Sequence, residues 1–300
     1  MSIHVIYDIS VLGLGQYLRT ARTGIHRFAD ELALGLLRED GVRVTFFAVD
    51  PLCNAFHVVG YLEENGFFEA HRSSCAFFDS RSIRLSYKWS RSWRDGVPGR
   101  KTAAFSWATL PATYALRRTG LSGRIESPVL ERPGVFHAPH YVRIPSYLRE
   151  KRNIRRFYTV HDLAPVKFPE YFRKSHLPYY GIRGVLRDLT GEDHVICVSE
   201  STKRDLLEYS AKVDRDKISV VYSAASRFFY PRNGDETDCV RRRYGIPEGP
   251  YILSVATLEP RKNLSHLITC FLSVIQEHKI GDLNLVLVGT KGWKYGDILQ

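Results

Sequence analysis

Two adjacent cations, Arg261 and Lys262, lie between a strongly apolar run, residues 251–258, and a segment with the apolar spacing of a helix. The first backbone N–H groups of a helix are unpaired and carry a partial positive charge, so they form a site for phosphate. An arginine there adds a bidentate fork, and a lysine adds a mobile point charge. This arrangement favours phosphate binding. The alternative is a solvated, proline-bent loop with ordinary surface cations, since helix starts more often carry acids.

His161 and Asp162 lie near the end of another apolar run, residues 156–163. In open α/β sheets ligands bind beyond the carboxyl ends of the strands, which is where this pair would lie. A histidine titrates near neutral pH and can hydrogen-bond a hydroxyl group. A single histidine at a strand end is also a common structural residue. The pair is therefore a candidate site whose role depends on its surroundings.

Gly24 and Arg27 lie at the start of a helical pattern that follows the first strand-like run. Glycine lets the backbone approach a phosphate closely, and the dipole of the following helix points toward that position. Arg27, one turn into the helix, would reach either phosphates or an acceptor. The structural alternative is a simple flexible turn.

Metal and dinucleotide sites find little support in the residue patterns. His137 and His140 have no carboxylate or cysteine at ligand spacing. Asp214 and Asp216 form a DxD, but within a polar connector typical of a solvated loop. Residues 13–18, GLGQYL, lack the third glycine of a dinucleotide-binding turn. We therefore expect no metal and no resident cofactor, and any nucleotide would be a substrate.

Eight short β-type runs alternate with helical patterns along the chain, and several are nearly continuous in Val, Ile, Leu and Phe. Such runs are typical of strands buried on both faces of a parallel sheet. Strand, helix and strand in this order predict a doubly wound α/β fold. The runs are residues 3–9, 42–49, 135–140, 156–163, 194–199, 218–225, 251–258 and 283–289.

The length of 300 residues exceeds what one hydrophobic core usually organises. A polar stretch rich in proline and glycine, residues 230–250, separates two strand-like runs and indicates a domain boundary. We expect a first domain over residues 1–235 and the beginning of a second, incomplete domain over residues 236–300. Two strands are too few for an independent core, so we expect the native chain to continue beyond Gln300.

The net charge of +11 favours an anionic partner. Charge is most lopsided in residues 81–124, where ten cations face one acid and three tryptophans are interleaved. This composition suits docking on an anionic membrane surface. A helical surface whose cationic stems cover buried tryptophans and a site for single-stranded nucleic acid are the alternatives, and nucleic acid is not the expected partner. The ten cations are Arg81, Arg84, Lys88, Arg91, Arg94, Arg100, Lys101, Arg117, Arg118 and Arg124.

Cysteine usage and hydropathy bear on the cellular compartment. The five cysteines are scattered and never in CxxC spacing, which favours a reducing environment. No apolar run is long enough to span a bilayer, and the first residues lack the pattern of a secretory signal. We expect a cytoplasmic protein, peripheral at the inner face of the membrane.

Several segments, in matching order, resemble glycosyltransferase family 4. They are TGIHR (23–27), TVHDLAPVKFPEYF (159–172), VICVSESTKRDLL (195–207), ISVVYSAA (218–225), ATLEPRKNL (256–264) and LVLVGTKGW (285–293). The resemblance, to the mannosyltransferase-like subgroup, implies the GT-B fold: two Rossmann-like, doubly wound domains facing each other across a cleft, the second truncated here. It also implies retaining transfer of a sugar from a nucleotide donor, without a required metal.

The resemblance also assigns a donor site. Lys262 matches the phosphate-binding lysine of the family, and Gly24 and Arg261 complete the expected contacts with the donor diphosphate. Many members carry an arginine where this chain has Thr257. Arg261 is the obvious substitute for that missing cation.

The remaining roles concern the sugar and the acceptor. The resemblance implies that His161 lies beside the reacting sugar, with Asp162 as its neighbour in the catalytic pair. Arg27, Ser199 and Glu259 are candidates for the acceptor site or the cleft. Ser199 is also expected to cap a helix, and Glu259 is equally well explained as a polar turn residue.

We therefore expect a retaining glycosyltransferase that moves a hexose such as mannose from a nucleoside diphosphate sugar to a glycan or lipid-linked acceptor in surface polysaccharide synthesis. The 300-residue chain is expected to be weakly active or inactive, because half of the donor pocket would be missing. Two alternatives belong to other classes. One is a non-catalytic GT-B scaffold or glycan-binding protein, and the other is a basic α/β protein that binds nucleic acid.

Overall fold

A computed structural model describes residues 2–17, 24–48, 128–172, 177–226, 229–292 and 294–298, together with residues 22, 58, 61 and 62. The described residues form two compact units, Met1–Ala224 and Ala225–Gln300. The first unit therefore ends before position 235, where the change in composition places the boundary. Among the described helices, none has the length and apolar character needed to cross a bilayer.

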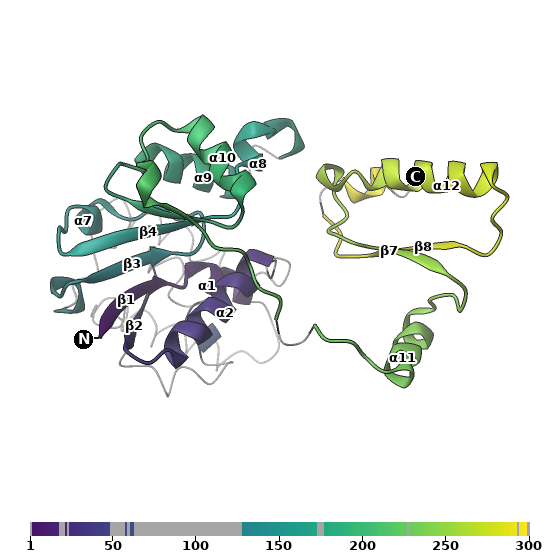
Figure 1. The fold of residues 1–300 in the computed structure, drawn as a ribbon, viewed down its shortest axis with the longest axis horizontal. Coiled ribbons are helices and arrows are strands. Elements are labelled where there is room, and N and C mark those ends of the chain that lie inside the picture. Colours follow the sequence, from purple (N-terminus) through teal and green to yellow (C-terminus); the bar gives the residue numbers. More distant parts are fainter. Residues whose placement is uncertain are drawn as a thin grey trace, which may run out of the picture. The chain divides into compact units, whose positions relative to one another are not determined.

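The first unit is built on one six-stranded sheet in which every neighbouring pair of strands is parallel (Figure 1). The strand order is β2-β1-β3-β4-β5-β6, so the order reverses between β1 and β3. Each strand falls within or overlaps a run that the apolar pattern predicts. The strands are β1 (Ile3–Asp8), β2 (Val42–Phe47), β3 (Gly134–Ala138), β4 (Ile154–Val160), β5 (His194–Cys197) and β6 (Ile218–Val220).

Helices follow the strands in the alternation that a doubly wound sheet requires. The helix α2 packs against β2, and α10 packs against β5 and β6. The prediction of a Rossmann-like α/β fold is thus confirmed. The helices among the described residues of this unit are α1 (Ser10–Tyr17), α2 (Gly24–Arg38), α7 (Ser146–Arg149), α8 (Ala164–Lys167), α9 (Leu177–Asp188) and α10 (Glu200–Tyr209), with 3₁₀ turns η4 (Pro128–Glu131), η5 (Pro169–Tyr171) and η6 (Arg215–Lys217).

The core of the first unit lies along the central strands, and its large side chains are fully buried. Phe47 of β2 meets Phe136 of β3 edge to face, with ring centroids 5.4 Å apart. Tyr7 of β1 is also buried, and its hydroxyl donates to the Ala29 carbonyl of α2 at 2.9 Å. This bond satisfies the buried phenol and fixes α2 on the sheet.

The second unit contains two parallel strands and one long helix. Its strands are apolar yet largely solvent-exposed; Leu253 and Val255 of β7 are 53% and 71% exposed. A two-stranded sheet buries too little surface to be stable alone. Its elements are α11 (Gly234–Tyr244), β7 (Tyr251–Val255), η7 (Pro260–Lys262), α12 (Leu264–Glu277), β8 (Asn284–Val288) and η8 (Tyr295–Ile298).

Candidate functional site

The carboxyl ends of β1 and β3 mark the point where ligands are expected in the first unit. Parallel neighbours whose connections run in opposite directions leave a crevice beyond their carboxyl ends, and the strand order reverses at this pair. β1 ends at Asp8, a buried carboxylate that accepts a hydrogen bond from the Ser10 hydroxyl at 2.8 Å. β3 ends at Ala138, and the segment Pro139 to Tyr141 follows.

His161 lies at this edge and is fixed by contacts from two parts of the chain, α2 and the segment after β3. It directly follows β4, the neighbour of β3. Its Nε2 lies 2.9 Å from the carbonyl oxygen of Pro139. The ring meets Phe28 of α2 edge to face at 4.9 Å, and it meets Tyr141 in the same way at 6.0 Å. The histidine is therefore held next to the β1–β3 crevice in one orientation.

The hydrogen bond to Pro139 defines which imidazole nitrogen carries the proton. A carbonyl oxygen only accepts, so Nε2 donates and Nδ1 is the acceptor of the neutral ring. Burial lowers the pKa of His161, while the Pro139 carbonyl and the nearby Asp162 carboxylate oppose this effect. At neutral pH the side chain is thus an uncharged group whose Nδ1 can accept a hydrogen bond from a hydroxyl.

Gly24 and Arg27 lie in the first turn of α2, the helix that contacts His161. Gly24 and Phe28 are four residues apart and share one face of the helix, so Gly24 lies on the face that packs toward His161. A Cβ added at Gly24 would meet no described atom within 4 Å. Packing in the described part of the chain therefore does not require glycine at this position. Arg27 is exposed on the same turn.

Asp162 is anchored mainly through its backbone, by a residue that sequence reasoning missed. The Tyr141 hydroxyl donates to the Asp162 carbonyl at 3.0 Å and accepts from the Asp162 N–H at 2.9 Å. The Asp162 carboxylate accepts from the Ala164 N–H at 3.1 Å, which forms a local turn. Tyr141 lies 20 residues before His161 in the sequence, and no spacing rule links a tyrosine to a distant main chain.

Ser199 caps α10, as its position in the sequence predicts. Its Oγ accepts from the Thr202 N–H at 3.1 Å. The Thr202 hydroxyl in turn donates to the carbonyl of His161 at 3.0 Å. The cap therefore connects the start of α10 to the main chain of the candidate site. Thr202 is a second contact that the sequence does not reveal.

The remaining histidines at this edge are structural in their surroundings. His137 is buried, and its Nε2 lies 2.9 Å from the Thr159 hydroxyl. Burial lowers the pKa of both His137 and His140 to about 4, and the neighbouring His161 adds to this effect. Within the described residues, no group of His, Cys, Asp or Glu side chains is arranged to hold a metal ion.

The DxD segment also has a structural explanation. The Asp214 side chain accepts from the Asp216 N–H at 3.0 Å and thereby caps the 3₁₀ turn η6. This is the solvated connector that the polar sequence predicts. A short turn capped by its own aspartate needs no bound ion to account for it.

In the second unit, Glu259 and Arg261 form an ion pair in the segment that follows β7. Glu259 is 4% exposed, and its Oε1 lies 2.6 Å from an Nη of Arg261. The Glu259 carboxylate therefore orients the guanidinium. The sequence leaves Glu259 open between a cleft residue and a polar turn residue, and its burial beside Arg261 adds a positioning role.

Lys262 and Arg261 do not open α12 itself, which corrects the expected placement. They form the 3₁₀ turn η7, and Asn263 then adopts a left-handed conformation (φ 52°) before α12 begins at Leu264. The Asn263 side chain makes no capping bond to α12. Lys262 is exposed, and its charge stands just before the start of the helix.

The loop after β8 lies directly against this turn. Leu258 and Lys291 form a parallel bridge, and the Gly292 N–H donates to the Leu258 carbonyl at 3.0 Å. A Cβ at Gly292 would lie 2.7 Å from that carbonyl oxygen, so the close approach requires glycine. The fold thus brings Lys291 beside the Glu259 turn, a neighbour that the sequence alone does not identify.

Together these features define the first unit as a Rossmann-like α/β domain. Its sheet is parallel, its strand order reverses once, and polar groups gather at the carboxyl edge next to the reversal. The sequence model of Glycosyltransferase Family 4 matches residues 22–225, about two thirds of the chain. The chain therefore belongs to Glycosyltransferase Family 4, and the sequence-based family assignment is confirmed.

Two relatives from Escherichia coli carry names that describe their activity. The O-antigen chain mannosyltransferase B is 25% identical over 160 residues, which are 53% of this chain and 40% of that protein. The serotype-specific mannosyltransferase WbdA is 25% identical over 162 residues, which are 48% of this chain and 18% of that protein. The matched region thus spans less than half the length of either relative.

The basic stretch of residues 81–124 lies outside the described residues. The expectation that it docks on an anionic membrane therefore remains a sequence-based prediction. The other candidate residues, Gly24, Arg27, His161, Asp162, Ser199, Glu259, Arg261 and Lys262, are all described above.

Proposed function

We propose that this chain carries the acceptor-side domain and the first donor-binding segment of a retaining glycosyltransferase. In this proposal the enzyme transfers a hexose, mannose in the first instance, from a nucleoside diphosphate sugar to a glycan or lipid-linked acceptor of a surface polysaccharide. Membership of Glycosyltransferase Family 4 and the two relatives named as mannosyltransferases support it. The observation that carries the proposal is the oriented, neutral His161 at the carboxyl edge of the sheet.

In the proposed reaction His161 binds a hydroxyl of the reacting sugar. Its Nε2–H is committed to Pro139, so the substrate hydroxyl donates to Nδ1. An uncharged imidazole suits this task, because it orients the sugar without competing for the negative charge of the donor. The first turn of α2, with Gly24 and Arg27, adds a positive partial charge close to the same histidine.

The proposed role of Lys262 and Arg261 is to stabilise the leaving diphosphate. Negative charge builds up on the diphosphate as the sugar–oxygen bond breaks, and fixed cations stabilise that charge by several kcal/mol in such sites. Glu259 holds Arg261 in place, whereas Lys262 is exposed. We also propose that residues 81–124 bring the enzyme to the inner face of a membrane, on the strength of their charge and tryptophans.

Donor binding can be tested by thermal shift, since a ligand that binds the folded form raises the melting temperature. We expect one of the GDP-, UDP- or TDP-linked hexoses to stabilise the full enzyme, which contains the whole donor pocket. Lys262→Gln should lose most of this shift, whereas Arg242→Gln, which removes an exposed charge from α11, should keep it. Equal shifts in the two variants, or no shift with any donor, would contradict the proposed donor site.

The proposed role of His161 is tested by turnover in the full enzyme. His161→Ala should lower kcat strongly, because the sugar loses an oriented hydrogen-bond acceptor. His278→Ala, at the exposed end of α12, should transfer sugar at the normal rate. Unchanged kcat in His161→Ala would exclude the assigned role.

A further inference from the structure

A second, strongly basic pocket lies in the first unit, where α9 and α10 end. It has a volume of about 830 Å³. Four cations line it, and the lining residues that the structure describes include no acid. The cations are Arg143, Arg183, Arg187 and Lys212.

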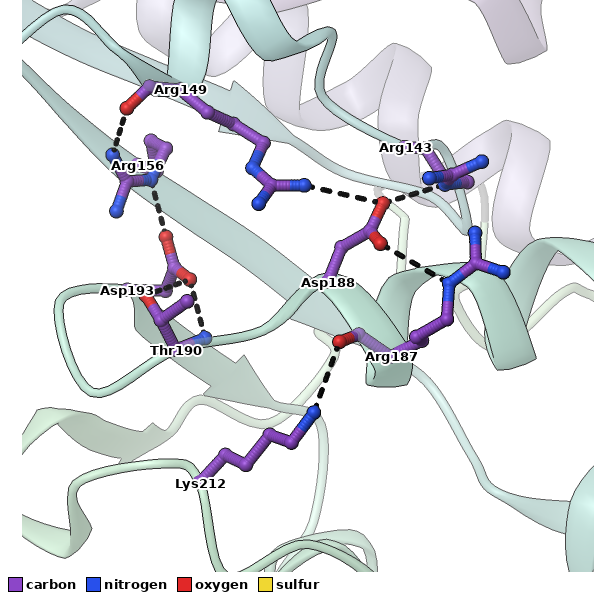
Figure 2. A network of polar contacts seen from close by, with 8 residues as sticks. All are labelled: Arg143, Arg149, Arg156, Arg187, Asp188, Thr190, Asp193 and Lys212. Carbon is purple, nitrogen blue, oxygen red and sulfur yellow. Dashed lines mark hydrogen bonds and ion pairs between the residues drawn. The ribbon is translucent and has the colours of Figure 1, made fainter.

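One carboxylate serves three of the nearby guanidinium groups, as Figure 2 shows. Oxygens of Asp188 lie 2.6 Å from Arg143, 3.5 Å from Arg149 and 3.4 Å from Arg187. A single negative charge cannot neutralise three cations. The side chains of Arg143 and Arg187 are also 53% and 66% exposed, so they can contact a ligand while still paired.

A second acid close to this cluster is already occupied. Asp193 is buried; it binds Arg156 at 2.5 Å and accepts from the Thr190 N–H and hydroxyl (Figure 2). The Lys212 Nζ lies 3.3 Å from the Arg187 carbonyl at the end of α9. The contacts of the described residues include no carboxylate that neutralises the charge of Lys212.

The ends of two helices would by themselves repel an anion. Each helix carboxyl end carries about half a negative charge, so α9 and α10 together contribute roughly −1. Even without Arg183, the other lining cations and Arg149, less Asp188, contribute roughly three positive charges. The positive charge of the cations is therefore several-fold larger than the partial negative charge of the two helix ends, and larger than stabilising those ends requires.

Apolar and aromatic residues also line the pocket. They are Leu186, Ala211 and Tyr209, of which Tyr209 is 49% exposed. An apolar surface next to guanidinium groups fits a phosphate ester, whose charged oxygens bind arginine and whose organic part packs on the ring.

This pocket is separate from the carboxyl edge that holds His161. α9 ends at Asp188, and the chain then enters β5 at His194, so the pocket adjoins the amino-terminal edge of the sheet. His161 follows the carboxyl end of β4, at the opposite edge. A ligand in the basic pocket is therefore not the sugar that His161 is proposed to bind.

We propose that this pocket binds the phosphate or diphosphate group of an organic molecule, through Arg143, Arg183, Arg187 and Lys212. The proposal goes beyond the transferase function and does not depend on it. Two sources present this chemistry, a soluble organic phosphate and an anionic lipid head group. The two sources are separated by the experiment.

The first measurement is calorimetric titration of the chain with inorganic pyrophosphate at low ionic strength. The double variant R183Q/R187Q should bind at least about tenfold more weakly than the wild type, because two phosphate contacts are lost. The control R38Q/R43Q removes the same charge from exposed positions at the end of α2 and in β2. It should bind within about twofold of the wild type. Both variants retain Arg261 and Lys262, so the proposed donor site contributes equally to each.

Equal affinities in R183Q/R187Q and R38Q/R43Q would overturn the proposal. If R183Q/R187Q does not fold, as judged by circular dichroism, then Lys212→Gln is tested in its place, and unchanged affinity in that variant has the same consequence. A charge-conserving variant, R183K/R187K, should retain part of the binding, because lysine keeps the charge but loses the fork.

Sedimentation with vesicles identifies the source of the phosphate. Binding to phosphatidylglycerol vesicles but not to phosphatidylcholine, weakened in R183Q/R187Q and competed by pyrophosphate, assigns the pocket to a lipid head group. Pyrophosphate binding in solution without such vesicle binding assigns it to a soluble organic phosphate. If R183Q/R187Q changes neither pyrophosphate binding nor vesicle binding, both assignments of the pocket are rejected.

Discussion

Two tyrosine hydroxyls in the first unit offer a test of how the candidate site is held together. Tyr141 and Tyr158 are both buried. The Tyr141 hydroxyl makes two hydrogen bonds to the backbone of Asp162, at 2.9 and 3.0 Å. The Tyr158 hydroxyl has no hydrogen-bond partner among the described residues. Replacing each tyrosine by phenylalanine therefore removes a hydrogen-bonded hydroxyl at position 141 and a hydroxyl without a described partner at position 158.

The two substitutions should change the free energy of unfolding by different amounts and not in the same direction. A net hydrogen bond contributes about 1 kcal/mol, so Tyr141→Phe should lower the free energy of unfolding by about 2 kcal/mol. The Asp162 N–H and carbonyl would then lose their partner as well. Tyr158→Phe loses no bond within the described residues and relieves a buried unpaired hydroxyl, so its free energy of unfolding should stay the same or rise by up to about 1 kcal/mol.

Equilibrium urea unfolding followed by circular dichroism measures both effects, with a separate transition allowed for each unit. With a slope of roughly 2 kcal/mol per molar urea, Tyr141→Phe should lower the midpoint of the first unit by about 1 M. Tyr171→Phe, an exposed tyrosine, is the control and should leave it unchanged. Equal midpoints for Tyr141→Phe and Tyr158→Phe would refute the assignment of Tyr141 as the anchor of this segment.

Three further outcomes follow from the structure. The pKa of His137 is about 4 in the folded chain and 6.5 when the side chain is exposed, so the unfolded chain binds more protons between these pH values. The free energy of unfolding should therefore fall by up to about 3 kcal/mol as the pH drops from 6.5 to 4. In unfolding measured as a function of pH, His137→Gln should flatten this slope. Ser199→Ala removes the cap of α10 and should lower the urea midpoint by the equivalent of about 1 kcal/mol, whereas Ser219→Ala, exposed on β6, should not. Gly289→Ala places a Cβ 1.7 Å from the Ala256 carbonyl oxygen and should make the second unit more sensitive to limited proteolysis. Gly281→Ala is the control, because a Cβ at that position meets no described atom within 4 Å, and it should be cleaved like the wild type. Equal cleavage of the two variants would contradict the close approach at Gly289.

The eight apolar runs of the sequence predict the eight strands that the structure describes, and the α/β class follows from their alternation with helices. The ends of the strands are less well predicted. Residues 194–199 and 218–225 read as continuous strands, but β5 ends at Cys197 and β6 at Val220. Apolar residues continue past the strand ends into the crevice and the connectors, so hydropathy alone does not mark where pairing stops.

The local position of the candidate residues could likewise be predicted. Gly24 begins a helix, Ser199 caps one, and His161 follows a strand, since each of these roles depends on neighbours within a few residues. Arg261 and Lys262, expected where the helix opens at Asn263, form a separate 3₁₀ turn just before α12. The left-handed Asn263 separates them from the helix, and its conformation is set by local backbone geometry that apolar periodicity does not report.

Local sequence thus determined the secondary structure, the family and the chemical types at the carboxyl edge, because periodicity, capping and motif spacing act over short distances along the chain. Only the tertiary structure decided which of these groups meet. It paired His161 with Pro139 and Phe28, Tyr141 with the backbone of Asp162, and Arg143 and Arg149 with Asp188. Those contacts join residues far apart in sequence, and they follow from the strand order, which the parallel pairing of the whole sheet fixes.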